Sequence, residues 1–233
     1  MADFKALLLE ETGGKVASRI APLDEALLPP GEVTVDVAYS TLNYKDGMIL
    51  NGLGRLVRKY PHVPGVDFAG MVTQTDSPDF KPGDAVILTG WRVGEAQWGG
   101  YAQKARVKAS YLVKLPKGLT LKRAMALGTA GFTAMLAVMA LEDHGLKPGA
   151  GEVLVTGAAG GVGRVATAVL AALGHHVTAS TGRAATHDYL RGLGAKTIID
   201  RAELAKRPSR PLDSERWAGA VDAVGSTTLA TIL

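Results

Sequence analysis

The sequence predicts an α/β protein of two parts: a β-rich first domain, and a second domain built on a doubly wound parallel sheet. Short strand-like runs bounded by Gly and Pro fill the chain to about residue 120, and strands and helices alternate after that point. A glycine-rich turn, VTGAAGGVG, separates a strand-like run from a helix-like run at residues 155–163. We therefore expect domains at residues 1–122 and 123–233.

In the first domain, alternation of apolar and polar residues is the main sign of strands. VTVDVAY follows the turn-forming residues PPG, and KPGD forms a turn before the apolar run AVIL. The expected strands cover residues 33–39, 65–75 and 85–88, and a further strand opens at 99–102.

In the second domain, the alternation of strands and helices predicts parallel strands joined by right-handed crossovers. We expect strands at 152–156, 176–180, 197–200 and 220–224. Expected helices cover 162–173 and 184–193, preceded by an Ala- and Met-rich helix at 121–141 that is interrupted at 128–131. Residues 206–215 form a polar loop that contains proline.

Composition limits the classes of protein. The 233 residues are 47% hydrophobic and 21% charged, which is ordinary for a soluble globular protein. The net charge of +4 is mild, and no basic run with interleaved aromatic residues favours nucleic acid. Gly, Lys or His interrupts the longest apolar runs, so we expect no membrane span. The chain has no cysteine and its first residues do not resemble a signal peptide, which indicates a cytoplasmic protein.

The glycine turn lies where a dinucleotide would bind, after a strand and before a helix. Bare backbone permits close approach of a pyrophosphate, and the helix N-terminus offers N–H groups to it. Counting back from Gly163 gives Gly160 and then Ala158, so the fingerprint G-x-G-x-x-G is a variant. A purely structural turn is the alternative. The candidate residues are Ala158, Ala159, Gly160, Gly161, Val162 and Gly163.

No acidic residue follows the second strand of this domain. Sites that prefer NAD place Asp or Glu there, to bind the ribose 2′-hydroxyl. Here the residues are Ser180, Thr181, Gly182 and Arg183. An arginine with two hydroxyl groups suits a 2′-phosphate, so we predict NADP(H) as the cofactor. The alternative is that Arg183 is a solvated residue at a helix start.

Six strings, LNYKD, PGVDFAG, GDAVILTGW, WGGYAQ, GTAGFTAM and TGAAGGVG, together resemble the medium-chain dehydrogenase/reductase superfamily. Longer strings, such as GTAGFTAMLAVMALEDHG, resemble its acrylyl-CoA reductase (NADPH) branch, also known as YhdH-type quinone oxidoreductases. The resemblance implies a GroES-like catalytic domain followed by a Rossmann-type domain. It also implies roughly a hundred further residues, because only four of about six strands are present. The family tends toward dimers, so we expect a homodimer at full length.

Zinc-containing members of the superfamily have a cysteine near Asn43 and Gly-His-Glu at 65–67. This chain has no cysteine, and its five histidines lack the spacing of a ligand set. We therefore expect no metal, and a reaction that an activated double bond makes possible without one. Reduction of acryloyl-CoA to propanoyl-CoA fits best. The alternatives are a quinone or enone reductase, and a non-catalytic NADPH-binding redox sensor.

The resemblance implies roles for individual residues. Tyr44 lies beside the nicotinamide and is the candidate proton donor, although water could supply this proton. Asn43 orients the catalytic site, Thr129 contacts the nicotinamide end, and Arg201 lies near the adenine. The alternatives are a packed tyrosine at a strand end for Tyr44 and a local turn for Thr129. Lys45 and Asp46 are expected to form an exposed ion pair of little consequence.

A cationic stretch follows Tyr44 and offers a site for the phosphates of an acyl-CoA thioester. Arg55, Arg58 and Lys59 are the candidate ligands, with solvated surface as the alternative. Trp91 flanks a glycine-rich loop, where it could form a wall of the substrate channel or belong to the core. A small quinone would need none of these charges.

Overall fold

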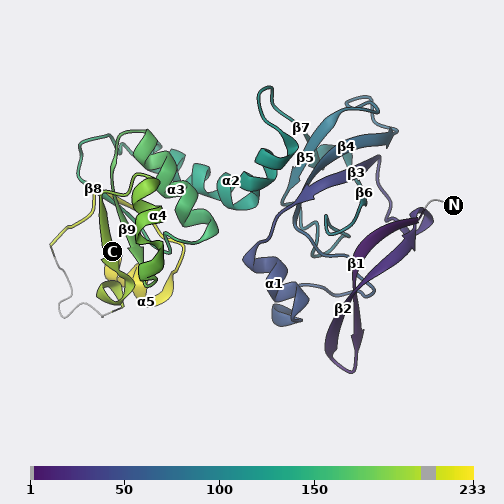
Figure 1. Ribbon diagram of the computed structural model, residues 1–233, viewed down its shortest axis with the longest axis horizontal. Coiled ribbons are helices and arrows are strands. Elements are labelled where there is room, and N and C mark those ends of the chain that lie inside the picture. Colours follow the sequence, from purple (N-terminus) through teal and green to yellow (C-terminus); the bar gives the residue numbers. More distant parts are fainter. Residues whose placement is uncertain (1–2, 206–213) are drawn as a thin grey trace. The chain divides into compact units, whose positions relative to one another are not determined.

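A computed structural model describes residues 3–205 and 214–233, so most of the expected polar loop at 206–215 lies outside the described residues. The chain divides into two units, Met1–Thr129 and Ala130–Leu233, which we describe separately. Unit 1 consists mostly of strands, and unit 2 of strands that alternate with helices (Figure 1). The α/β fold class predicted from the sequence is confirmed.

Unit 1 is built around a five-stranded antiparallel sheet. Its strands are β3 (Val33–Ser40), β4 (Asp67–Thr75), β5 (Ala85–Thr89), β6 (Lys104–Val107) and β7 (Val113–Lys114), in the spatial order β6-β3-β4-β5-β7. Val33 and Val35, on one face of β3, pack with Phe68, Val86 and Leu88 in a buried cluster. The expected strand at 99–102 begins later, at Lys104, and only Ala102 forms an isolated bridge, to Ala6.

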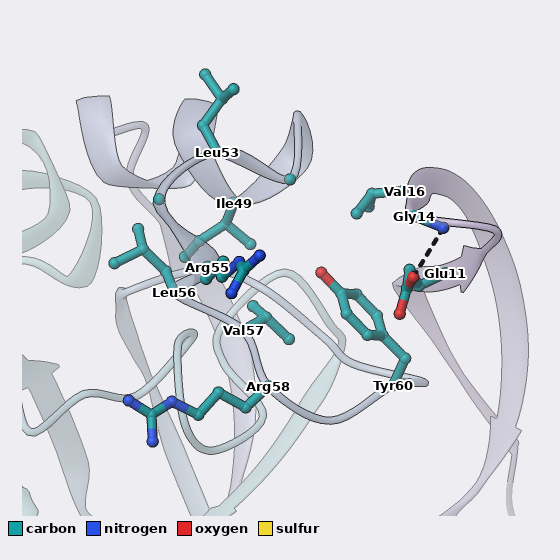
Figure 2. A pocket seen from close by; sticks show the side chains of 12 residues that line it. Glu11, Gly14, Val16, Ile49, Leu53, Arg55, Leu56, Val57, Arg58 and Tyr60 are labelled. Carbon is teal, nitrogen blue, oxygen red and sulfur yellow. Dashed lines mark hydrogen bonds between the residues drawn. The ribbon is translucent and has the colours of Figure 1, made fainter.

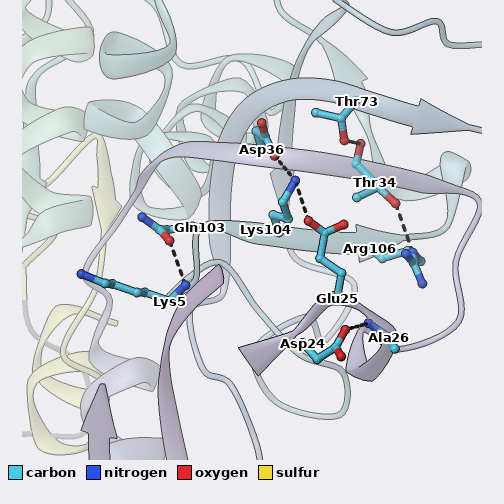
Figure 3. Close-up of polar contacts among 10 residues, drawn as sticks. All are labelled: Lys5, Asp24, Glu25, Ala26, Thr34, Asp36, Thr73, Gln103, Lys104 and Arg106. Carbon is cyan, nitrogen blue, oxygen red and sulfur yellow. Dashed lines mark hydrogen bonds and ion pairs between the residues drawn. The ribbon is translucent and has the colours of Figure 1, made fainter. Parts of the chain in front are cut away.

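An N-terminal hairpin, β1 (Asp3–Thr12) and β2 (Lys15–Asp24), was not predicted as separate strands. Gly13 and Gly14 both have positive φ, as the tight turn between the strands requires. The hairpin is joined to the rest of unit 1 by a hydrogen bond from the amide of Leu7 to the carbonyl of Tyr101, 2.8 Å long. Glu25, directly after β2, is also connected to the five-stranded sheet, because Lys104 of β6 pairs with both Glu25 and Asp36 of β3 (Figure 3).

Short helices connect the strands of unit 1. The main one, α1 (Tyr44–Leu50), begins directly after the loop that follows β3, and the one-turn helix η2 (Leu53–Arg55) follows it. Two further one-turn helices are η1 (Glu25–Leu27) and η3 (Ala109–Tyr111). The sequence prediction placed LNYKD after a strand but did not identify it as a helix start.

Unit 2 contains a four-stranded parallel sheet in the order β10-β9-β8-β11. Its strands are β8 (Glu152–Val155), β9 (His176–Thr181), β10 (Thr197–Asp200) and β11 (Gly219–Val221), and its helices are α3 (Gly161–Ala172), α4 (His187–Gly192) and α5 (Ser226–Ile232), with the one-turn helices η4 (Ala184–Thr186) and η5 (Arg201–Leu204). The order corresponds to strands 3-2-1-4 of a doubly wound dinucleotide fold. The predicted parallel sheet and its crossover helices are confirmed.

Helix α2 (Leu121–Asp143) has a sharp kink at Gly128, where φ is 51° and ψ is −157°. The interruption expected at 128–131 is therefore a single residue, because the chain is helical again from Thr129. Within the described residues, α2 alone is long and apolar enough to cross a membrane, and 33% of its most apolar window is buried. Core helices of soluble proteins pass the same test, so this is weak evidence for a membrane span.

Candidate functional site

The glycine turn of unit 2 connects β8 to α3 and leaves several amide groups available for a ligand. Gly157 adopts φ +55°, and its carbonyl accepts the amide of Gly160, closing the turn at 2.8 Å. Gly160 caps α3 without a side-chain hydrogen bond. Because the first amides of a helix have no carbonyl partner within it, the N–H groups of residues 161–163 form a ready site for an anion.

Two candidate residues of this turn act through packing. A Cβ at Gly163 would lie 2.4 Å from the carbonyl oxygen of Gly157 and 2.6 Å from Cα of Ala158, so the helix approaches the turn as closely as a bare backbone allows. Ala158 is buried in the unit 2 core, and its amide donates to the carbonyl of Ser180 at 3.1 Å. Ala158 therefore shapes the turn and does not offer its N–H to a ligand.

Two arginines lie beside Gly182, which directly follows β9. Arg183 is exposed, and its Nη2 donates to the carbonyl of Ala159 at 3.3 Å, so its side chain extends toward the turn. Arg201, which follows β10, lies against Gly182, where a Cβ would come within 2.6 Å of the arginine Nε. The sequence prediction placed the two arginines at separate parts of a cofactor, whereas the structure places both beside Gly182.

The hydroxyl residues before Arg183 are less accessible than the arginine. Ser180 and Thr181 are only 2% and 5% exposed. The Oγ1 atom of Thr181 accepts the amide of Arg183 at 3.2 Å, so this hydroxyl stabilises the turn that carries the arginine. Of these candidates, Arg183 therefore has the side chain most open to a phosphate.

In unit 1, the loop before α1 is held by a buried carboxylate. Asp46 is 0% exposed and accepts the amides of Asn43 at 2.9 Å and Val66 at 3.1 Å. Lys45 instead pairs with Glu95, at 2.8 Å. The expected ion pair between Lys45 and Asp46 is therefore wrong, because successive residues at a helix start point in different directions.

A second buried carboxylate gathers the candidate residues of unit 1. Asp67, also 0% exposed, accepts from the Oγ1 atom of Thr41 at 2.6 Å and from Nδ2 of Asn43 at 3.0 Å. It also accepts the amide of Thr129 at 2.9 Å and the hydroxyl of the same residue. Asn43 and Thr129, which are 86 residues apart by their numbers, therefore bind one carboxylate.

Asn43 is a structural member of this network. Its side-chain NH₂ donates both to Asp67 and to the Oγ1 atom of Thr41, at 2.6 Å. Because an ionised carboxylate can only accept, the amide orientation is fixed. The residue also forms a capping box with Asp46 at the start of α1. Its hydrogen-bond donors are therefore not available to a substrate.

Tyr44 is the exposed phenol of this region. It is the first residue of α1, and its side chain is 88% exposed, so it is not the packed tyrosine considered as an alternative. A nearby phenol, Tyr101, instead donates to the carbonyl of Thr41 at 2.8 Å. Burial, together with the charges of Asp46 and Asp67, raises the pKa of Tyr101. Tyr101 stays protonated and bonded, which leaves Tyr44 as the accessible donor of the pair.

A pocket of ≈ 730 Å³ lies between the hairpin turn and the segment that follows α1 (Figure 2). Arg55 and Arg58 line it, together with Tyr60 and an opposing carboxylate, Glu11. Figure 2 shows the Arg58 side chain extending away from Tyr60. The third cation expected from the sequence, Lys59, is not among the lining residues. The structure thus brings two of the three candidates to one pocket.

Trp91 is held on the surface of unit 1. It has a positive φ of 55° and stacks on Tyr111, with ring centroids 4.8 Å apart and an interplanar angle of 10°. The residue is 58% exposed, so it does not belong to the core. No group of three or more His, Cys, Asp or Glu residues suited to a metal ion occurs in the part of the chain that the structure describes.

Comparisons with known proteins place this site in context. Residues 29–117 match the family described as alcohol dehydrogenase GroES-like domain. The chain is 62% identical over 232 residues to "Acrylyl-CoA reductase AcuI" of Ruegeria pomeroyi, and covers 70% of that protein while 99% of this chain is matched.

Two solved structures are closely similar to this chain. The yhdH oxidoreductase of Salmonella enterica, in complex with NADP, has a TM-score of 0.95 and 53% identity, with 98% of this chain and 70% of that chain covered. Protein yhfP of Bacillus subtilis, with NAD bound, has a TM-score of 0.96 and 43% identity, with 100% and 70% covered. These two similar structures therefore contain different nicotinamide cofactors.

Proposed function

We propose, on the premise that this chain belongs to the acrylyl-CoA reductase (AcuI/YhdH) branch of the medium-chain dehydrogenase/reductase superfamily, that it reduces acryloyl-CoA to propanoyl-CoA with NADPH. The observation that carries the proposal is the pair of arginines beside Gly182: Arg183, which bonds the Ala159 carbonyl of the glycine turn, and Arg201, which follows β10. Cations at this position favour a cofactor with a 2′-phosphate.

The residues of unit 2 fit NADP(H). We assign the pyrophosphate to the amides of residues 161–163, with Gly163 permitting the close approach, and the 2′-phosphate to Arg183, with Arg201 beside it. Thr181 stabilises this phosphate site, because its Oγ1 atom accepts the Arg183 amide. When bound, NADPH supplies the hydride for the reaction.

The residues of unit 1 act on the substrate. The carbonyl of an enoyl thioester makes its β-carbon electrophilic, and reduction there leaves an enolate that must be stabilised and protonated. We assign this proton donation to Tyr44, because it is an exposed phenol at the start of α1 and a phenol O–H can donate a proton. Asn43 holds the loop before Tyr44, and Thr129 contributes to the nicotinamide end. No step requires a metal ligand.

Replacing Tyr44 with phenylalanine tests the proton donor. We expect kcat for acryloyl-CoA to fall about tenfold, at the low end of general acid contributions because water can reach an exposed site. The KM for NADPH should stay within twofold. Steady-state assays of NADPH oxidation measure both quantities. Tyr189→Phe, at an exposed tyrosine of α4, is the matched control. An unchanged kcat for the Tyr44 variant would assign the proton to water.

We further propose that the pocket beside α1 receives the phosphates of coenzyme A. Arg55 and Arg58 supply charge, and the ring of Tyr60 supplies an apolar wall. Tyr44 begins α1, and the pocket starts at its other end with Ile49. Seven helical residues span only about 10 Å, a short step for the pantetheine arm of coenzyme A. Trp91 stays a candidate for the wall of the acyl end.

The double variant Arg55→Ala/Arg58→Ala tests this pocket. We expect the KM for acryloyl-CoA to rise about tenfold, as loss of two exposed phosphate contacts of about 0.7 kcal/mol each would produce. The KM for a small quinone should not change. Lys59→Ala is the control, because this cation does not line the pocket. Equal effects of the control and the double variant would refute the pocket and leave only a diffuse positive field.

The direct test of the function compares two acceptors. NADPH oxidation by the protein, followed by absorbance with acryloyl-CoA and a simple quinone, should show a much larger kcat/KM for the thioester. Quinone reduction is the second candidate, because the Bacillus subtilis relative is named for it and the pocket charges would then have no role. NADPH binding without turnover of either acceptor would favour a redox sensor.

The proposal also covers the roles of the two domains, the type of partner and the state of the protein in the cell. We assign residues 1–122 to substrate chemistry and residues 123–233 to the cofactor. The substrate is a small molecule, and no nucleic acid or membrane has a part in the reaction. The protein is proposed to be a cytoplasmic homodimer, which gel filtration and fractionation would test.

A further inference from the structure

The carboxylate of Asp67 accepts four hydrogen bonds, from Thr41 and from the candidate residues Asn43 and Thr129. Its Oδ2 atom accepts from Thr41, from Asn43 and from the amide of Thr129, and its Oδ1 atom accepts from the hydroxyl of Thr129. All four donors are neutral. None of the ion pairs within the described residues includes Asp67.

A buried charge without a cation must be stabilised by its hydrogen bonds, because its loss of hydration is costly. The four donors around Asp67 are therefore held in strong hydrogen bonds to its carboxylate, and each donor is fixed in one orientation. The carboxylate connects three segments in this way: the loop before α1, the start of β4, and the kink of α2. Asp67 therefore determines the relative positions of Thr41, Asn43 and Thr129.

Gly128 shows how closely the kink of α2 approaches this carboxylate. A Cβ at Gly128 would lie 2.9 Å from Oδ2 of Asp67 and 2.6 Å from Cγ2 of Thr41. The positive φ at Gly128 then turns both the amide and the hydroxyl of Thr129 onto Asp67. The kink and the carboxylate thus fix the placement of Thr129 together.

We propose that Asp67 is a positioning residue of the reaction, which holds Asn43, the start of α1 and Thr129 in the arrangement needed for turnover. The inference rests on the proposed function, because the roles of Tyr44 and Thr129 are assigned there. Asp67 itself is buried, with no surface open to a substrate. Its effect should therefore appear in kcat and not in the binding of either substrate.

Two substitutions at the same position separate positioning from charge. Asp67→Asn can keep every contact: its Oδ1 can accept from Thr41, Asn43 and the Thr129 amide, while its NH₂ donates to the Thr129 hydroxyl. Asp67→Ala removes all four contacts. We expect kcat for acryloyl-CoA, per NADPH-binding molecule, to fall at least tenfold in the alanine variant and less than threefold in the asparagine variant. KM values should stay within threefold.

Hydrogen exchange provides a readout that does not depend on the substrate. The Thr129 amide should exchange faster in Asp67→Ala than in the wild type and near the wild-type rate in Asp67→Asn. If the alanine variant does not fold, Thr129→Val removes one contact with little change of shape, and a threefold lower kcat is expected.

The outcomes distinguish this inference from the proposed function. Wild-type kcat per NADPH-binding molecule in Asp67→Ala, or an asparagine variant as slow as the alanine variant, would overturn the positioning role. Unchanged exchange of Thr129 in Asp67→Ala would overturn it as well. A wild-type protein that binds NADPH but does not reduce acryloyl-CoA would instead contradict the proposed function, while the exchange experiment still tests Asp67.

Discussion

Replacing Arg183 with alanine is expected to weaken NADPH binding about 30-fold and to leave NADH binding within twofold. The guanidinium extends toward the glycine turn, where its Nη2 bonds the Ala159 carbonyl, and no acidic residue stands at the end of β9. Loss of a charge-assisted hydrogen bond to a phosphate costs about 2 kcal/mol, or roughly 30-fold in affinity. NADH lacks the 2′-phosphate and should not be affected.

Fluorescence titrations with NADPH and NADH would measure the two affinities. Arg191→Ala, an exposed arginine of α4 that pairs with Asp188, is the matched control and should change neither. Because Arg183 is exposed, the difference between the cofactors should also shrink as salt is added. Equal losses for NADPH and NADH would assign Arg183 to the general shape of the turn.

The NAD-bound structure of the Bacillus subtilis protein raises the question of which residues select between NADPH and NADH in this chain. That protein shares 43% identity and a TM-score of 0.96 with this chain, so the fold alone does not select the cofactor. We expect selection to arise from side chains that follow β9 and β10, where the ribose 2′ position would lie. The buried Ser180 and Thr181 are poor candidates for direct selection, which leaves Arg183 and its neighbour Arg201.

The features that could be predicted from the sequence depend on short stretches of chain. The strand predicted at 33–39, observed at 33–40, follows from alternation within seven residues, and the turn at 155–163 follows from local glycine spacing between a strand and a helix. Parallel pairing in unit 2 follows from the order of its elements. Each of these predictions needs no knowledge of a distant partner.

The features that could not be predicted depend on residues far apart in the sequence. Asp67 bonds Asn43, 24 residues before it, and Thr129, 62 residues after it, and no local pattern marks these contacts. The partner of Lys45 is Glu95, 50 residues away, whereas proximity in sequence suggested Asp46. The start of α1 was missed for a related reason: its capping box and the buried Asp46 become visible only in the fold.

Replacing Gly163 with alanine is expected to give the largest loss of cofactor binding. The new methyl group would lie 2.4 Å from the Gly157 carbonyl oxygen, and both atoms that it meets first belong to the backbone. The turn must move away from α3, so the amides of residues 161–163 no longer fit a pyrophosphate. Loss of two charge-assisted hydrogen bonds at about 1.5 kcal/mol each would weaken NADPH binding more than 100-fold.

Stability measurements decide whether this glycine serves the cofactor or only the fold. Overpacking against the backbone should lower the free energy of unfolding by about 1–3 kcal/mol. Gly192→Ala in α4 is the control, because nothing lies within 4 Å of its Cβ and alanine favours a helix. A Gly163 variant that loses stability but binds NADPH like the wild type would identify a purely structural glycine turn. A loss of NADPH affinity larger than the fraction of unfolded protein explains would instead indicate that the pyrophosphate binds the backbone at this position. The amides of residues 161–163 have no carbonyl partner within the helix, so a shift of these amides should affect ligand binding more than it affects stability.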